Sequence, residues 1–154
     1  MQRISPRPFN GANAILLSVH REMADASVRR LAAVSEGQGY TVDTLNEDRL
    51  LMTTADRPLE PTQNGTAAPV RYRLIAYVVK KGGGPTVVEL WGTLRFTDAS
   101  GRLVERTMQW DGPRDHSPAA ACFGRVQQLA QAFPAEQLVS IRYTREKGLV
   151  SPRN

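Results

Sequence analysis

The sequence has little that could provide covalent or metal-based stability. It contains one cysteine, Cys122, so the chain can form neither an intramolecular disulfide nor a thiolate cage for a metal. Aromatic residues make up only 6% of the chain. The longest apolar runs, such as 14–19 and 75–79, are much shorter than the roughly 20 residues that a membrane-spanning helix needs. The fold must therefore be stabilised by ordinary packing, and insertion into a membrane is not expected.

The rest of the composition is that of one globular domain. The chain has 154 residues, of which 41% are hydrophobic and 23% charged, and single domains cluster near about 100 to 150 residues. Its net charge of +5 permits an anionic partner without requiring one. Prolines and arginines interrupt the first residues, so no secretory signal is expected. The sequence predicts a cytoplasmic protein as written, and a periplasmic one only if an export segment has been removed.

Two segments have the periodicity of amphipathic helices. The first extends from about residue 20 to residue 37, and Gly39 follows as a helix stop. The second is predicted over 118–133, because Ser117 can cap the first turn and proline tolerates the first helical position. Its apolar face consists of Cys122, Val126, Leu129, Ala130 and Phe133.

Short β-prone runs separated by turn residues predict an antiparallel sheet made of a hairpin and a three-stranded meander. In the middle run, alternate residues are apolar, which is typical of a strand with one face on a core and the other largely solvated. The core face would carry Val88, Leu90, Leu94 and Phe96, and the solvated face Glu89, Trp91, Thr93 and Arg95. The predicted strands are 40–42, 50–54, 70–81, 86–96, 102–110 and 138–144.

These elements predict an α+β fold in which two helices cover one face of the antiparallel sheet. The expected organisation is an irregular N-terminal arm over 1–19, a single domain over 20–144 and a basic C-terminal tail over 145–154. Within the domain, the proline-rich residues 55–69 are expected to form an exposed connection. A connection of this length is uncommon in a compact domain and is often functional.

Chemically reactive side chains are few, and their spacing does not favour catalysis. Asp111, Asp115 and His116 stand near Ser117, but a turn and a helix cap explain them without a reaction. Cys122 lies on an apolar helical stripe, which favours a small buried hydrophobe over a nucleophile. An enzyme would require these groups, or His20, to converge in one pocket. The sequence therefore predicts no enzyme, no cofactor and no metal site.

Two binding alternatives stay open. Arginines and lysines are spread over the meander, but they are mixed with carboxylates, and Tyr72 and Tyr77 have opposite parity on one strand, so they cannot form a shared stacking platform. Nucleic-acid binding is therefore the weaker alternative. The other is a lipid or small hydrophobic ligand held between sheet and helix. Its expected lining is Trp91, Phe96, Met108 and Trp110.

The order of helix, hairpin, long loop, meander and helix over about 20–133 resembles the helix-grip-like α+β domains of small bacterial envelope proteins, including accessory lipoproteins of outer-membrane protein assembly. The resemblance depends on four sequence segments, in this order: Val28-Arg29-Arg30-Leu31, Gly39-Tyr40-Thr41-Val42, Leu50-Leu51-Met52-Thr53-Thr54 and Tyr72-Arg73-Leu74. The sequence departs from such lipoproteins because it lacks a signal segment and an acylated cysteine near its start. The resemblance implies a noncatalytic accessory domain, with peripheral membrane association as one form of it.

The favoured hypothesis is a noncatalytic accessory or adaptor subunit that binds a protein partner in a larger complex. The periodic segments are occupied in making one core, whereas 1–13, 55–69 and 145–154 are irregular and basic. Such segments can order along a partner and add charge complementarity. The predicted partner-binding residues are Arg3, Arg7, Arg57, Arg145, Lys147 and Arg153.

Overall fold

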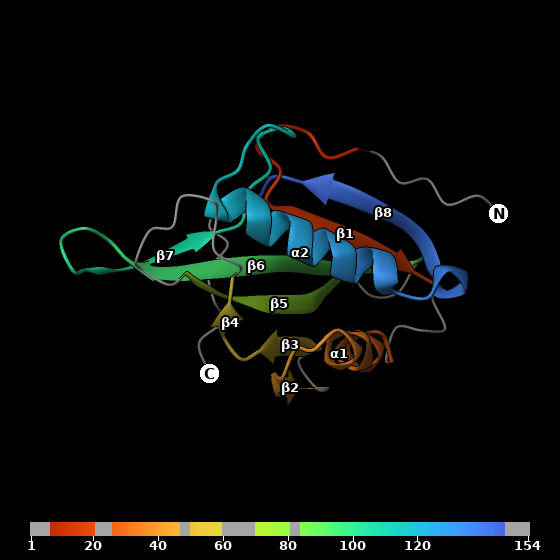
Figure 1. Ribbon diagram of the computed structural model, residues 1–154. Coiled ribbons are helices and arrows are strands. Elements are labelled where there is room, and N and C mark those ends of the chain that lie inside the picture. Colours follow the sequence, from red (N-terminus) through yellow and green to blue (C-terminus); the bar gives the residue numbers. More distant parts are fainter. Residues whose placement is uncertain (1–6, 21–25, 47–49, 60–69, 81–83, 147–154) are drawn as a thin grey trace.

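The computed structural model describes residues 7–20, 26–46, 50–59, 70–80 and 84–146. They form a mixed α/β fold with one eight-stranded antiparallel sheet and two α-helices, which confirms the predicted class (Figure 1). The strand order is β2-β3-β5-β6-β1-β8, with β4 also beside β5 and β7 also beside β6. The strands are β1 (Ala14–Val19), β2 (Val42–Asn46), β3 (Leu51–Thr54), β4 (Arg57–Pro58), β5 (Arg71–Lys80), β6 (Thr86–Thr97), β7 (Leu103–Thr107) and β8 (Leu138–Thr144).

Strand β1 lies inside the sheet, between β6 and the outermost strand β8. The prediction of an irregular arm over 1–19 is therefore wrong for residues 14–19. Five of the six residues of β1 are buried, so the strand lacks the polar alternation of a strand with one solvated face. The apolar run of residues 14–19 is the sequence signal of this buried strand.

The hairpin, the meander and the last strand are confirmed, with three differences. The first strand of the hairpin is Val42–Asn46 rather than 40–42. The third strand of the meander ends at Thr107, and Trp110 instead forms an isolated bridge with Ala12. The predicted exposed connection is wrong for its described part, 55–59. There β4 pairs with β5, and Leu59 is 5% exposed.

The start of α2 and the end of α1 have local causes. Helix α2 (Pro118–Ala132) begins where predicted, and the Ser117 hydroxyl accepts a hydrogen bond from the backbone N–H of Ala120 at 3.2 Å. Helix α1 (Ser27–Gly37) begins later than the predicted residue 20, and residues 21–25 lie outside the described residues. Gly39, with a φ of +91°, adopts the left-handed conformation expected after α1.

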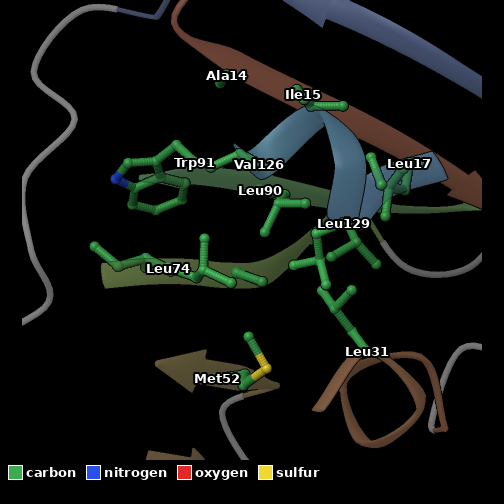
Figure 2. Close-up of a cluster of buried hydrophobic side chains, with 14 of the residues drawn as sticks. Ala14, Ile15, Leu17, Leu31, Met52, Leu74, Leu90, Trp91, Val126 and Leu129 are labelled. Atoms are coloured by element: carbon green, nitrogen blue, oxygen red, sulfur yellow. The ribbon is translucent and has the colours of Figure 1, made fainter. Parts of the chain in front are cut away.

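The core lies between the helices and one face of the sheet. Helix α2 crosses β1 and β6, while α1 lies beside β2 and β3 and contacts α2 (Figure 1). Leu31 of α1 and Leu129 of α2 meet above Leu90 and Leu74 of the sheet (Figure 2). All four side chains have no exposed surface. We call this the helix face, and the opposite side the helix-free face.

The two strands that end the main strand order, β2 and β8, are protected against the addition of another strand. Edge strand β2 has a register shift between Val42 and Thr44, and its Asp43 is exposed. Edge strand β8 has a register shift opposite Ser18/Val19 and an exposed charge at Arg142. Bulges and charges at edges disfavour strand pairing. A partner is therefore not expected to extend the sheet at β2 or β8.

Candidate functional site

The polar residues before α2 have structural partners. The Asp115 carboxylate accepts a hydrogen bond from the backbone N–H of Ser117 at 2.9 Å, and Ser117 itself caps the helix. The Asp111 carboxylate accepts one from the Gln109 side-chain amide at 2.6 Å. These contacts shape the turn and the helix start, as the sequence indicated.

Cys122 is a buried hydrophobe, as predicted. Its thiol has no exposed surface, and burial raises its pKa to about 12, so it is protonated at neutral pH. His116 is exposed, whereas the backbone N–H of His20 donates to the Gln137 carbonyl at 3.2 Å. In the part of the chain that the structure describes, no three His, Cys, Asp or Glu side chains are grouped as metal ligands.

The predicted lipid lining is not assembled. Trp110 packs against Phe123 of α2 with ring centroids 5.8 Å apart, and Met108 has no exposed surface. Trp91 lies on the other face of the sheet, as the register of β6 requires. Phe96 shares the helix face but is only half-buried.

Two of the predicted partner-binding arginines lie at one corner of the molecule, which we call the basic corner. The Asn13 side chain donates to the Glu146 carbonyl and accepts from the Glu146 N–H, both at 2.8 Å. Arg145 is exposed, and its guanidinium lies over Gly11. Arg7 is exposed in the same N-terminal segment. The described ends of the chain are therefore tied together here.

Arg57, a third residue of that prediction, is packed against an aromatic ring. Arg57 belongs to β4, and its guanidinium carbon lies 4.5 Å from the centre of the Tyr40 ring. Tyr40 and Tyr72 share a hydrogen bond of 2.9 Å between their hydroxyls, so Arg57 covers a buried pair. Three of the predicted residues lie outside the described residues: Arg3, Lys147 and Arg153.

The helix-free face is the unexpected feature of the structure. A Cβ on Gly92 would meet Cys122 and Val126 of α2, so the even-numbered residues of β6 point to the helices and the odd-numbered ones point away. Glu89, Trp91 and Thr93 on that second side are only 6%, 2% and 2% exposed. The prediction that this side is largely solvated is wrong for these three residues.

The centre of the helix-free face combines a carboxylate with two aromatic rings. Tyr77 of β5 stands directly opposite Glu89 of β6. The rings of Tyr77 and Trp91 have centroids 5.5 Å apart and planes 83° apart. Residues directly opposite on antiparallel strands have Cβ atoms about 5 Å apart. The three side chains are therefore immediate neighbours.

The charge at this centre is negative and incompletely compensated. Burial raises the pKa of Glu89, and the negative charge of Glu146 raises it further. The pKa of Tyr77 is raised by burial, then by Glu89 and Glu146. Among the described residues, Glu89 has no hydrogen bond and no salt bridge; the Glu146 carboxylate accepts one hydrogen bond, from the Thr144 hydroxyl at 3.2 Å.

Two donors of this face also lack partners. The indole Nε1 of Trp91 and the Nε of Arg73 are buried without a hydrogen-bond partner among the described residues. Figure 2 shows the Trp91 indole nitrogen pointing away from Leu90 and Leu129. A buried donor without a partner costs about 1 to 3 kcal/mol. Such a cluster of unsatisfied groups distinguishes this face from ordinary core packing.

Glu89→Gln is expected to increase the free energy of unfolding at pH 7. The folded protein holds the carboxyl proton more tightly than the unfolded chain, so the wild type loses stability as the pH rises from the ordinary Glu value of 4.5 through the raised pKa. The neutral amide avoids this loss. Urea denaturation of both proteins between pH 4.5 and pH 7 measures it, and the advantage of the variant should shrink as the pH falls. A variant that is less stable at pH 7, or a pH-independent difference, would contradict the assignment.

No protein-family model matches the sequence, and no curated protein is significantly similar to it. The resemblance to envelope lipoproteins depends on the order of elements and stays a prediction. The described residues include no helix that is both long enough and apolar enough to span a membrane.

Proposed function

We propose that the protein is a noncatalytic accessory domain that binds an acidic surface of a protein partner through the basic corner. The observation that carries the proposal is the pair of hydrogen bonds between the Asn13 side chain and the backbone of Glu146, at 2.8 Å each. They hold the exposed Arg145 beside the N-terminal segment that carries Arg7. Phe9, 48% exposed, adds an apolar group to the same segment.

The position of this corner supports binding without rearrangement of the core. Ala12 has no exposed surface, and its carbonyl accepts a hydrogen bond from the Trp110 N–H at 2.8 Å. The segment that carries Arg7 is therefore fixed at its base. Since β2 and β8 are protected edges, side-chain contacts at the corner fit a partner better than strand addition does. Exposed charges of this kind mainly increase association rates and specificity.

The finer assignment belongs to the same proposal. Two helices on one face of an antiparallel sheet support a helix-grip-like arrangement, and a complex associated with the bacterial envelope is the setting that the sequence resemblance implies. A peripheral position at the membrane fits a domain that binds through a corner of its surface.

Charge reversal at the corner tests the proposal. Arg7→Glu combined with Arg145→Glu is expected to reduce recovery of the partner at least tenfold in a cross-linking pull-down from native extract, read by mass spectrometry. The melting temperature should stay unchanged, because both side chains are exposed. Recovery by the wild type should also fall as salt is raised, since exposed charges are screened over about 8 Å at physiological ionic strength.

The matched control is Arg30→Glu combined with Arg106→Glu. Both residues are exposed, on α1 and β7, and the change in net charge is the same. This variant should recover the partner as the wild type does. Equal recovery by the corner variant, or an equal loss in the control, would exclude the basic corner as the interface.

A further inference from the structure

The centre of the helix-free face has the geometry of a site for an organic cation. Tyr77 and Trp91 present two aromatic rings at 83° to each other, 5.5 Å apart. Glu89 stands opposite Tyr77 and two residues before Trp91 on the same face. Cations bind the faces of Trp and Tyr rings within about 6 Å of their centres, and more strongly when they are desolvated. Two nearly perpendicular rings beside a carboxylate are a suitable arrangement for this.

Among the side chains that the structure describes, none is a counter-ion for the negative charge of this centre. Of the β5 cations with described side chains, Arg71 and Arg73 share this face, and the nearer one, Arg73, lies four residues from Tyr77, about 13 Å along the strand. Arg142 of β8 is exposed. It is separated from Glu89 of β6 by strand β1, in which Leu16 pairs with both residues. Arg95 forms ion pairs with Asp56 and Glu105. An unpaired buried carboxylate is unfavourable, and a cation placed here would relieve it.

Burial and ligand number identify the class of cation. Glu89 and Trp91 are 6% and 2% exposed, so the end of a narrow chain suits the site better than a broad surface does. A divalent metal would need further oxygen or nitrogen ligands, and the described residues contain no group of three such side chains. We propose that the helix-free face binds a primary alkylammonium group, with Glu89 as its counter-ion and the rings of Tyr77 and Trp91 as its walls. The group is that of a small amine or of the end of a lysine side chain.

Titration with n-butylammonium tests the proposal, followed by the indole N–H signal of Trp91 in NMR spectra of the wild type. A saturable shift of this signal is expected, while butan-1-ol, the neutral analogue, should give none. In the Trp110→Phe variant, Trp91 is the only tryptophan, and its fluorescence gives a second measurement. A lysine-containing peptide, compared with its norleucine analogue, separates a lysine side chain from a small amine as the ligand. If the ligand is a lysine side chain, the lysine peptide should bind more tightly than n-butylammonium does.

Three variants and one control decide the roles of the residues. Glu89→Gln should weaken n-butylammonium binding at least tenfold while the protein stays folded, and Glu36→Gln, at an exposed position of α1, should leave it unchanged. Tyr77→Phe keeps the ring and should bind within about twofold of the wild type, whereas Tyr77→Leu should bind at least fivefold more weakly. Absence of a saturable signal, an equal response to butan-1-ol, or wild-type affinity in Glu89→Gln would overturn the proposal.

Discussion

Replacement of Leu129 by Ala is expected to lower the free energy of unfolding by about 2 to 5 kcal/mol. Leu129 has no exposed surface and lies where α2, α1 and the sheet meet (Figure 2). Its removal leaves a cavity between Leu31 and Leu90, which belong to elements that are held by other contacts and can only partly close it. The loss therefore includes the transfer of the side chain and the cavity that remains.

Urea denaturation monitored by circular dichroism measures this loss. Gln128→Ala is the matched control, because Gln128 is the preceding residue of α2 and is exposed. Surface changes of this kind usually alter stability by less than about 0.5 kcal/mol. An unchanged unfolding midpoint for Leu129→Ala would mean that this face of α2 does not lie on the core.

The helix face could be predicted because its signal is local. The apolar spacing of α2, the cap at Ser117 and the glycine-rich turns of the meander are all read from neighbouring residues. Strand β1 was missed because it has no alternation and follows a segment rich in proline and asparagine. Its pairing with β6 and β8 joins residues about 70 and 125 positions away, and no local pattern records that.

The helix-free face could not be predicted for a related reason. Alternation along β6 correctly places Leu90 on one face of the sheet and Glu89 and Trp91 on the other. It does not predict whether the second face is exposed to solvent. Whether the second face is solvated depends on tertiary contacts. A tryptophan on the side expected to be solvated was the available signal, since exposed tryptophans are uncommon. The closeness of Tyr77 and Glu89 follows from the register between β5 and β6.

Arg57 shows the same limit for charged residues. A basic residue in a proline-rich stretch predicts a partner contact, and the structure adds a contact that the local sequence does not reveal: the Arg57 guanidinium lies over the ring of Tyr40, 17 residues earlier. Its charge lowers the pKa of Tyr40, but burial and the hydrogen bond with Tyr72 raise that pKa more strongly. Arg7 and Arg145 are the predicted partner-binding residues whose described side chains are exposed, and partner binding by any of the six stays a prediction.

Gly92→Ala is expected to lower the free energy of unfolding by about 1 to 3 kcal/mol, although it adds only one methyl group. A Cβ at this position would lie 2.6 Å from the Cys122 Sγ and 3.1 Å from the Val126 Cγ2. Both atoms belong to α2, which is packed against β6. Relief of the clash therefore requires the helix to move away from the strand, and buried contacts on either side would be lost.

The same substitution at Gly124 provides the control. Gly124 lies within α2, and no other atom lies within 4 Å of its Cβ position, so Ala there should stabilise the protein by about 0.5 to 1 kcal/mol through its helix propensity. Chemical denaturation of both variants compares the two effects. If close approach of α2 is the cause at Gly92, then truncating Cys122 to Ala should reduce the cost of Gly92→Ala, because the nearest atom is gone. An equal cost of Gly92→Ala in the two backgrounds would show that the sulfur contact does not set the distance between helix and sheet.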